Sequence, residues 1–296
     1  MHKEPSQNVD RLPRGDGTVK GQERETPPLV ATDLDGTLLD YATRRVPEGF
    51  DEVLGRVLAA GAAFAVASGR TPHGIRTLFP RFADRLWLVC DNGARLCRGA
   101  ELVEFRAMPG DLWTAYARAG LAVPDTDVVI VGRDACFAPP WTESDRAFLE
   151  TVYHPLLVSS DPVAAAAGTP VCKVLVRLRR GAPDALDPLR ARFGSALSLS
   201  GAEPGWLDAM APGVDKGSGI RALQRILGAD PARCVCFGDW ENDVPMLRAC
   251  GRSYAMRGGH PAALAAARFV APPCAEGGVA AVLRTLFPAR DAERRA

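Results

Sequence analysis

The sequence predicts an α/β fold with a mainly parallel sheet, into which an α+β module is inserted. Short, continuously apolar runs at residues 28–34 and 62–69 alternate with helix-like stretches. This rhythm is typical of parallel strands that are covered by helices on both faces. After about residue 96 the strand-like segments alternate or follow one another closely, and the first rhythm returns near residue 211. The sequence therefore predicts a core, an insertion and a second stretch of core.

The first stretch of the core should contain three strands and two helices. The expected order is strand, helix, strand, helix and strand, at residues 28–34, 47–61, 62–69, 71–82 and 86–94. Gly61 is expected to end the first helix, because glycine adopts the left-handed conformation that often follows a last helical turn. Pro80 should break the second helix. The third strand runs into an Asn-Gly turn.

The insertion should combine strands with a few helices. Strands are expected at residues 128–132, 173–179, 197–201 and 206–210. Residues 202–205, Ala-Glu-Pro-Gly, form a turn signal between the last two strands. Residues 144–153 are helix-like. The mixture indicates an α+β module.

The second stretch of the core resumes the alternation of helix and strand. Helices are expected at 215–228, 242–251, 260–267 and 277–287, with strands at 233–239, 253–256 and 267–272. The predicted domains are a discontinuous core at 29–96 and 211–288, an inserted domain at 97–210, and tails at 1–28 and 289–296. Both tails are expected to be disordered because they are polar and charged.

Composition narrows the class of protein. A net charge of +1 over 296 residues argues against a dedicated binder of nucleic acid or of a membrane surface. No stretch approaches the roughly 18 apolar residues of a membrane span, and residues 1–28 contain no apolar run that would suit a signal peptide. The eight cysteines form no C-x-x-C pair, which argues against a zinc site. We therefore expect a cytoplasmic protein with reduced, buried thiols.

Four short motifs follow predicted core strands or begin a predicted core helix. They are Asp33-Leu34-Asp35-Gly36-Thr37, Ser68-Gly69-Arg70, Lys216 within Gly-Val-Asp-Lys-Gly, and Gly238-Asp239-Trp240-Glu241-Asn242-Asp243. Open α/β sheets place their sites at the carboxyl ends of the strands. Asp33 and Asp35 share one face of the chain, so their carboxylates repel each other unless a cation lies between them. Together the motifs predict a metal-assisted site.

These motifs resemble those of the haloacid dehalogenase superfamily, within the Cof-type phosphatases that carry a large cap between the second and third motifs. DLDGT, SGR, GVDKG and GDWENDVPML match the four family motifs in order, over residues 29–287. DNGA (91–94), YAM (254–256) and EGGVA (276–280) match lesser signatures. The resemblance implies a Rossmann-like core and an inserted α+β cap. It also implies Mg²⁺-dependent phosphoryl transfer through an aspartyl-phosphate intermediate.

The resemblance and the chemistry of phosphate esters assign roles to the motif residues. Asp33 is expected to be the nucleophile and a metal ligand. Asp35 should bind the metal through its carbonyl and exchange protons with the leaving group and water. The remaining expected roles are metal binding by Asp239 and Asp243, phosphate binding by Leu34, Ser68, Gly69 and Asn242, and charge compensation by Lys216.

Several residues have two readings in the sequence. Arg70 could reach the substrate or pair within the core, and Asn92 is more typical of a turn than of a substrate ligand. His260 is more typical of a capping residue than of a catalytic base. Trp240 could pack on the substrate or on the cap. The cap residues that could contact a leaving group are Arg133, Trp141, His154, Lys173 and Trp206.

The predicted activity is hydrolysis of small phosphorylated metabolites, such as sugar phosphates, with no nucleic-acid or membrane partner. A sugar phosphomutase is the alternative, because it shares the aspartyl-phosphate chemistry and a related cap. A metal-dependent glycosyltransferase also uses D-x-D, but without the Gly-Thr and GDxxND elements present here. A binding protein that had lost activity would be expected to lack Asp33, Asp35 or Lys216, and all three are present. The sequence predicts no oligomeric state and does not select among phosphorylated metabolites.

Overall fold

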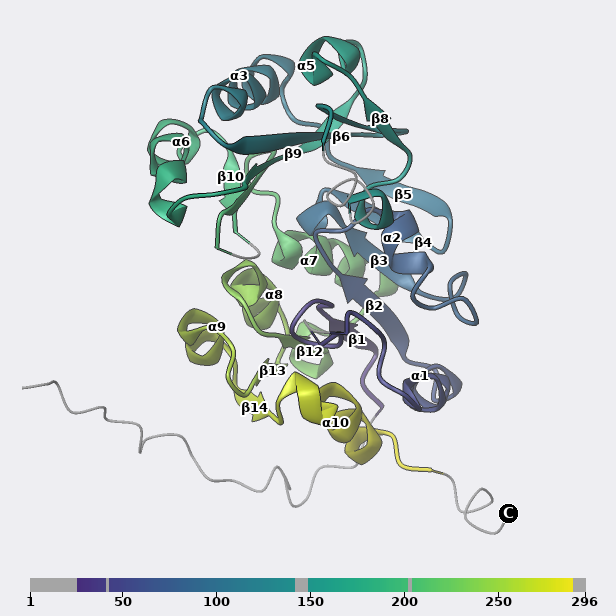
Figure 1. The fold of residues 1–296 in the computed structure, drawn as a ribbon. Helices are drawn as coiled ribbons and strands as arrows, with labels where there is room; N and C mark the ends of the chain where they lie inside the picture. Colours follow the sequence, from purple (N-terminus) through teal and green to yellow (C-terminus); the bar gives the residue numbers. More distant parts are fainter. Residues whose placement is uncertain (1–25, 41–42, 142–148, 202–203, 290–296) are drawn as a thin grey trace, which may run out of the picture.

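The structure, a computed structural model, describes residues 26–40, 43–141, 149–201 and 204–289, which form two sheets with their helices, one above the other (Figure 1). We call the larger sheet and its helices the core and the smaller sheet and its helices the cap. The core sheet has the order β14-β13-β12-β1-β2-β3-β4-β5. Its strands are β1 Leu29–Thr32, β2 Ala63–Ala67, β3 Trp87–Cys90, β4 Arg95–Arg98, β5 Glu101–Phe105, β12 Val235–Gly238, β13 Arg252–Met256 and β14 Phe269–Ala271.

The core sheet is parallel from β14 to β3, and β4 and β5 extend it antiparallel. Alternate residues of β1 pack into different hydrophobic clusters: Val30 contacts one, while Leu29 and Ala31 contact the other. Two buried clusters on opposite faces are what a parallel sheet between helix layers requires. The predicted continuous apolar strands are therefore confirmed.

Helices from both stretches of the chain cover the two faces of the core sheet. They are α1 Phe50–Ala59, α2 Pro72–Arg76, α7 Lys216–Leu227, α8 Val244–Ala249, α9 Pro261–Ala266 and α10 Gly278–Leu286. The cluster of Val30 includes residues of α1 and α10, and the cluster of Leu29 includes residues of α7, α8 and α9. Helix α2 ends at Arg76, four residues before Pro80, and is therefore shorter than the stretch 71–82 that the sequence predicts. Proline has no backbone N–H to donate to a helix that continues past it.

The cap is built on a six-stranded sheet of order β10-β11-β9-β6-β7-β8, antiparallel except for the pair β7 and β8. Its strands are β6 Thr126–Gly132, β7 Cys136–Ala138, β8 Leu156–Val158, β9 Val171–Leu178, β10 Ser198–Ser200 and β11 Trp206–Met210. Its helices are α3 Gly110–Leu121, α5 Pro162–Ala165 and α6 Asp187–Phe193. Residues of these elements form a separate hydrophobic cluster, so the cap has a core of its own.

The strand pairing corrects the first predicted domain boundary. The boundary at 96/97 falls inside β4, which pairs with β3, and β5 continues the same sheet. The core sheet therefore extends to Phe105 before the chain enters the cap. The change from parallel to antiparallel strands at Cys90 gave the sequence the appearance of a new module. The return near residue 211 agrees with the end of β11 at Met210.

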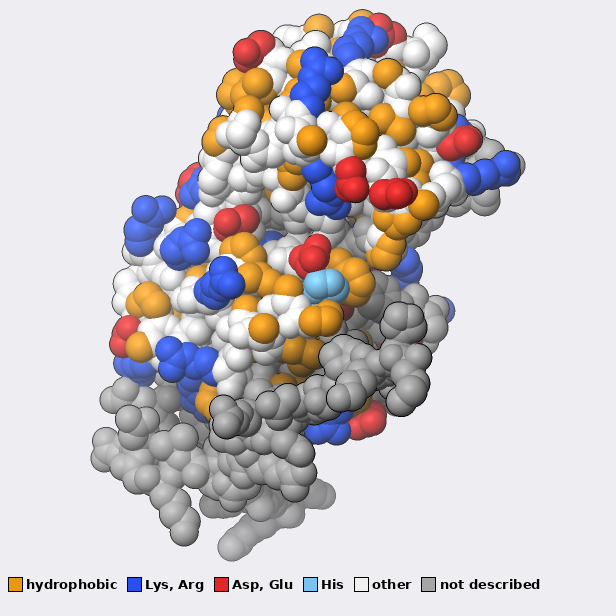
Figure 2. All heavy atoms as spheres, turned by 90° about the vertical axis from the view of Figure 1, so that its left-hand side faces the viewer, with side chains coloured by type: hydrophobic (Ala, Val, Ile, Leu, Met, Phe, Trp, Pro, Cys, Tyr) orange, Lys and Arg blue, Asp and Glu red, His pale blue; other side chains and the backbone are white. Residues whose placement is uncertain are grey.

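The described residues contain no helix that is long and apolar enough to cross a membrane. On the face shown in Figure 2, Lys and Arg side chains are interspersed with Asp and Glu side chains. Short 3₁₀ turns complete the fold at Asp91–Gly93, Pro183–Leu186, Pro231–Arg233, Glu241–Asp243 and Cys274–Glu276. Most of the tails predicted at 1–28 and 289–296, part of the predicted helix 144–153 and part of the turn 202–205 lie outside the described residues.

Candidate active site

The predicted motifs meet at one edge of the core sheet, below the cap. Asp33 directly follows β1, Ser68 directly follows β2, Asp239 directly follows β12, and Lys216 is the first residue of α7. Because β1, β2 and β12 are parallel neighbours, their carboxyl ends lie side by side. The topology alone therefore brings segments about 200 residues apart in sequence to one place.

Local backbone chemistry fixes the start of α7 and hence Lys216. Asp215 caps the helix: its carboxylate accepts a hydrogen bond from the Ser218 amide at 2.6 Å, and the Ser218 hydroxyl accepts one from the Asp215 amide at 3.0 Å. Such a reciprocal capping box satisfies two amides that the first helical turn leaves unpaired. The capped turn places the Lys216 side chain at the carboxyl ends of the strands.

Lys216 joins two of the predicted acids. Its ammonium donates hydrogen bonds to Asp33 Oδ1 at 2.6 Å and to Asp243 Oδ1 at 2.7 Å. The three residues are at most 5% exposed. Asp243 is thus the residue of the last motif that hydrogen-bonds Lys216. Asn242 instead lines the cavity beside Asp33.

The electrostatics of the cluster follow from burial and charge. Burial raises the pKa of the Asp33 carboxyl well above its ordinary value, and the carboxylates of Asp243 and Asp239 raise it further, whereas Lys216 opposes the shift. Burial alone would lower the pKa of Lys216, but the charges of Asp243 and Asp33 outweigh it and raise that pKa. Lys216 is thus held as a cation.

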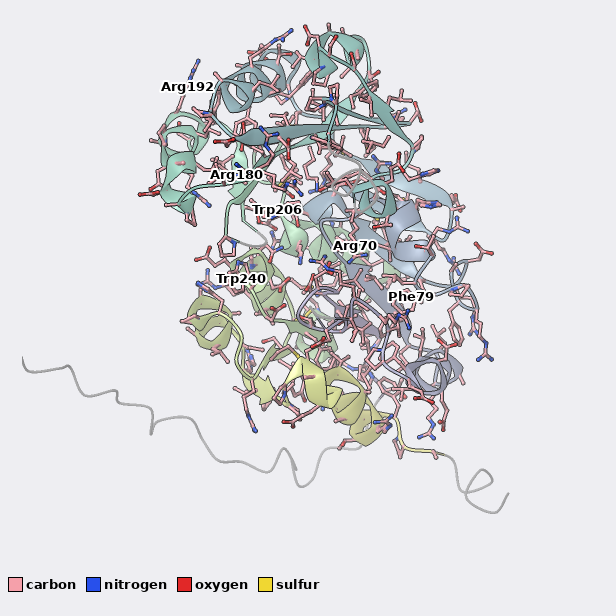
Figure 3. All side chains as sticks on the ribbon, in the orientation of Figure 1. Arg70, Phe79, Arg180, Arg192, Trp206 and Trp240 are labelled. Atoms are coloured by element: carbon pink, nitrogen blue, oxygen red, sulfur yellow. The ribbon has the colours of Figure 1, made fainter. Side chains whose placement is uncertain are left out.

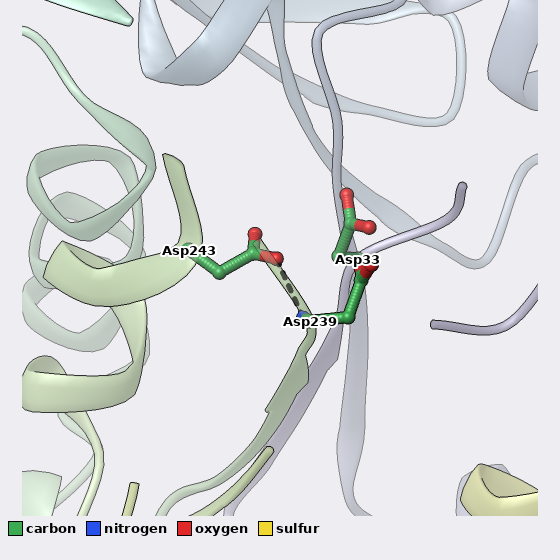
Figure 4. Close-up of side chains that lie close together, drawn as sticks. All are labelled: Asp33, Asp239 and Asp243. Atoms are coloured by element: carbon green, nitrogen blue, oxygen red, sulfur yellow. Dashed lines mark hydrogen bonds between the residues drawn. The ribbon is translucent and has the colours of Figure 1, made fainter. Parts of the chain in front are cut away.

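Three carboxylates form the candidate metal centre. Oxygen atoms of Asp33, Asp239 and Asp243 lie within 4.8 Å of one another (Figure 4). The Thr37 hydroxyl donates to Asp239 Oδ1 at 2.7 Å, and the Asp239 and Trp240 amides donate to Asp243 Oδ2 at 2.9 and 3.2 Å. With all three carboxylates ionised, this buried cluster has two negative charges more than the single ammonium of Lys216 balances. A hard divalent cation with oxygen ligands, such as Mg²⁺, fits that donor set and that charge.

Asp243 has many donors around it already. Lys216 and two backbone amides bind its carboxylate, as just described. Its neighbour Gly238 allows this approach, because a Cβ at Gly238 would lie 2.5 Å from the Asp243 Cβ. Asp243 therefore braces the loop after β12 as well as adding charge to the centre.

Arg70 pairs with Asp35 within the core, which is one of its two sequence readings. Its guanidinium donates from Nε to Asp35 Oδ2 at 3.0 Å and from Nη2 to Oδ1 at 2.6 Å, a bidentate ion pair. Arg44 lies 3.9 Å from the same carboxylate. Both arginines also line the cavity, as Asp35 does, so the ion pair lies where a bound molecule would be.

A cavity opens between the motifs and the cap. The motif residues Asp33, Asp35, Ser68, Gly69, Arg70, Lys216, Trp240 and Asn242 line its core side, together with Arg44. Val152, Tyr153, Trp206 and Asp208 line its cap side. Figure 3 shows Arg70, Trp206 and Trp240 around this junction. Leu34 is fully buried, so its expected phosphate contact would involve its backbone only.

The other candidates divide between the site and the scaffold. His260 caps α9 through a hydrogen bond from the Ala262 amide, as the capping reading predicts. Of the five cap candidates, only Trp206 lines the cavity, and Lys173 is buried beside it. The remaining three contact other groups or pack elsewhere: Arg133 lies over Phe105, His154 stacks on His73, and Trp141 packs against the cap cluster.

Asn92 is a turn residue with a specific partner. It adopts a left-handed conformation with φ 54°. Its side-chain amide donates to Asp208 Oδ2 at 2.7 Å. The adjacent Gly93 is required by packing, because a Cβ there would lie 2.1 Å from the Asp215 carbonyl oxygen.

Sequence reasoning missed Asp208, Tyr153 and Arg44. Asp208 had a usable signal, because it is an acid in the short buried strand β11 beside a second strand that contains a buried lysine, Lys173. A buried acid and a buried base on neighbouring apolar strands predict an ion pair. Tyr153 and Arg44 carry no such pattern in the sequence.

Comparisons with known proteins agree with this geometry. The family model for haloacid dehalogenase-like hydrolases matches residues 30–283. A phosphatase of Escherichia coli K12 named for 5-amino-6-(5-phospho-D-ribitylamino)uracil is 26% identical over 247 residues, covering 81% of this chain and 89% of that protein. The structure of SMU.1108c from Streptococcus mutans superposes with a TM-score of 0.79 at 20% identity, over 88% of this chain and 99% of that one. The subclass IIB sugar phosphatase BT4131 gives a TM-score of 0.76 at 23% identity, over 87% and 98%.

Proposed function

This chain belongs to the haloacid dehalogenase-like hydrolases and is a phosphatase, and we propose that it is a Mg²⁺-dependent one that acts on small phosphorylated metabolites through a phosphorylated Asp33. The observation that carries the proposal is the buried cluster in which Lys216 bridges Asp33 and Asp243 beside Asp239. Its excess negative charge, beside a cavity, calls for a cation, and that cation together with Lys216 would attract a phosphate group.

In the proposed site, Asp33, Asp239 and Asp243 hold Mg²⁺, with the Asp35 carbonyl as a further ligand. Bound there, Mg²⁺ supplies positive charge that lets an anionic nucleophile approach an anionic phosphate. The Ser68 hydroxyl and the backbone at Leu34 and Gly69 bind phosphoryl oxygens, and Asn242 adds an amide. Lys216 neutralises charge between the phosphate and Asp33.

The reaction has two displacements at phosphorus. In the first, an oxygen of Asp33 forms a bond to phosphorus while the bond to the ester oxygen breaks, and Asp35 gives a proton to the leaving alkoxide. In the second, Asp35 takes a proton from a water molecule whose oxygen attacks the same phosphorus. The bond to Asp33 then breaks, which releases inorganic phosphate and restores the carboxylate.

The walls of the cavity suggest a leaving group with a ring. Beyond the phosphate position the lining includes Trp240 from the core and Tyr153 and Trp206 from the cap. Trp206 is braced by the Arg177 guanidinium at 5.7 Å, and Trp240 by the His260 ring at 5.0 Å. Flat rings, whether heterocycles or sugars, bury apolar surface well against such side chains. The ribitylaminouracil phosphate named for the Escherichia coli relative is one such molecule.

Phosphate release across a panel of esters tests the proposal. The panel contains ribitylaminouracil phosphate, FMN, pyridoxal phosphate and hexose phosphates, with acetyl phosphate as a donor that has no ring. We expect release with MgCl₂ and none with EDTA. Trp206→Ala should raise KM for ring-bearing esters about tenfold and leave acetyl phosphate unchanged, while Trp206→Phe retains a ring. Release that persists in EDTA would contradict the metal-dependent mechanism.

A sugar phosphomutase, the alternative that the sequence leaves open, would use the same Asp33 chemistry. The two activities differ in the acceptor of the phosphoryl group, which is water in a phosphatase and a second sugar hydroxyl in a mutase. Hexose 1-phosphate with a hexose bisphosphate activator distinguishes them. Isomerised hexose phosphate without inorganic phosphate would favour the mutase.

A further inference from the structure

A second buried lysine lies where the cap meets the core. Lys173 on β9 is completely buried. Its ammonium donates to the Gly69 carbonyl at 2.6 Å, to Asp208 Oδ2 at 3.0 Å and to the Tyr153 hydroxyl at 3.4 Å. Asp208 and Tyr153 belong to the cap, whereas Gly69 belongs to the core. All three ammonium protons are thus used, and one of them crosses between the two parts of the molecule.

Asp208 makes a second crossing contact. Its Oδ2 accepts from Lys173 and also from the Asn92 side-chain amide of the core at 2.7 Å. A Cβ at Gly69 would lie 3.7 Å from the same oxygen, so the carboxylate lies directly against the phosphate-binding loop. The pair of Lys173 and Asp208 therefore contacts the core at two points.

These two points belong to one unit of the core. The loop of Ser68, Gly69 and Arg70 and the turn of Asp91 and Asn92 are joined by backbone hydrogen bonds. The Asn92 amide donates to the Ser68 carbonyl at 3.0 Å, and the Asp91 amide to the Arg70 carbonyl at 3.1 Å. The cap thus contacts the loop that carries Ser68 and also the turn, Asp91 and Asn92, that supports this loop.

The charges of Lys173 and Asp208 allow this pair to hold a backbone group of the core in place. Lys173 and Asp208 balance each other. Burial alone would lower the pKa of Lys173, but Asp208, Tyr153 and Asp91 together outweigh it and raise that pKa, so the lysine stays charged. A buried ion pair is weak evidence for stability, because hydrophobic residues of similar volume often serve as well. A charged hydrogen bond to a peptide carbonyl, in contrast, holds that peptide firmly in one place.

We propose that Lys173 and Asp208 are positioning residues, which couple closure of the cap to the placement of the Ser68–Arg70 phosphate-binding loop. The inference rests on the proposed phosphatase function for its role in turnover. When the cap closes, the ammonium holds the Gly69 carbonyl, and Asp208 holds Asn92. When the cap opens, Lys173 and Asp208 remain paired with each other, and their hydrogen bonds to Gly69 and Asn92 break. The loop is then preorganised for phosphate only in the closed state.

The test compares Lys173→Met with Asp127→Asn. Asp127 is a matched control, because it forms a buried ion pair with Arg177 at 3.0 Å in the same sheet. It lies outside the cavity lining given above. For Lys173→Met we expect the Kd of inorganic phosphate, measured by calorimetry with MgCl₂, to rise about tenfold, the loss expected for one charged hydrogen bond. KM should rise with it, and kcat at saturation should fall less. Asp127→Asn should leave the Kd of inorganic phosphate unchanged.

A second variant distinguishes weaker phosphate binding from a loss of folding. Lys173→Met leaves Asp208 buried without its cation, which destabilises the cap, whereas Lys173→Met/Asp208→Leu removes both charges together. We expect the double variant to unfold at a temperature close to that of the wild type and still to bind phosphate weakly. Wild-type affinity for phosphate in a folded double variant would overturn the proposal.

Small-angle X-ray scattering tests closure without turnover. Loss of the two crossing contacts should increase the radius of gyration of Lys173→Met and of the double variant, but not that of Asp127→Asn. A radius equal to that of the wild type in all three variants would contradict the coupling. If the wild type released no phosphate from any ester, the proposed function would fail, and the scattering comparison would still decide the role of Lys173.

Discussion

Both lysines among the described residues are almost completely buried, Lys216 in the core and Lys173 in the cap, and the charges around them differ. Lys216 lies among the carboxylates of Asp33, Asp239 and Asp243, which leaves two negative charges in excess. Lys173 has one carboxylate, Asp208, and its other partners are a carbonyl and a hydroxyl. The first cluster is incomplete without a cation. The second is neutral, and its remaining hydrogen bonds hold two parts of the chain together.

The comparison gives a physical rule for reading such sites. Burying an uncompensated charge costs several kcal/mol, so a surplus of one sign indicates that a charged ligand belongs there. A balanced ion pair needs no charged ligand, and the other groups that it hydrogen-bonds indicate its role.

The largest effect is expected for Asp33→Asn. The amide is neutral and a poor nucleophile, so turnover should fall below detection. Phosphate release with the best ester of the panel measures this. Appreciable residual hydrolysis by the purified variant would mean that Asp33 does not attack phosphorus.

Lys216→Met should lower kcat by several orders of magnitude, roughly 10³-fold, because it removes the charge that faces both Asp33 and the phosphate. It should also lower the unfolding temperature in EDTA, since the three carboxylates then repel one another. MgCl₂ should restore part of that loss. In Lys173→Met, by contrast, the change in unfolding temperature should not depend on MgCl₂. Equal dependence on MgCl₂ in both variants would contradict the distinction between the two clusters.

Thr37→Val should have a smaller effect on the same centre. The substitution keeps the shape of a buried side chain and removes the hydrogen bond to Asp239. Loss of such a supporting bond typically weakens metal binding at least about tenfold. Calorimetry with MgCl₂ provides the measurement. An unchanged affinity would show that Thr37 does not orient Asp239.

The smallest effect concerns another contact between core and cap. His73 of α2 stacks on His154 with ring centroids 4.2 Å apart. Burial, with the charges of His154 and Arg76, lowers the pKa of His73 from 6.5. The unfolded chain therefore binds the proton first, and stability falls as pH drops through about 6.5. His73→Asn should reduce the loss of unfolding temperature between roughly pH 7.5 and 5.5. If the unfolding temperature of the variant fell as much as that of the wild type, His73 would not contribute to the pH dependence of stability.

The sequence was sufficient for features that depend on local pattern. Asp33, Ser68, Lys216 and Asp239 follow strands or begin a helix, and parallel topology brings such positions together whatever the rest of the chain does. The fold class was predicted for the same reason. These features required no knowledge of which distant side chains meet.

Contacts between distant segments could not be predicted in this way. The pairing of Asp35 with Arg70 joins two core loops that are far apart in sequence, and the contact of Asp208 with Asn92 depends on how the cap lies on the core. The boundary at 96/97 was wrong because β4 and β5 extend the core sheet by hairpin pairing, which local pattern does not distinguish from the antiparallel strands of the cap.

The account depends most on the claim that Asp33, Asp239 and Asp243 bind a divalent cation. Calorimetric titration of MgCl₂ into the metal-free wild type, Asp239→Asn and the control Asp127→Asn tests it most directly. The account predicts one Mg²⁺ per chain in the wild type and the control, and an affinity at least about tenfold weaker in Asp239→Asn. Equal affinity in all three proteins, or no binding to the wild type, would contradict it.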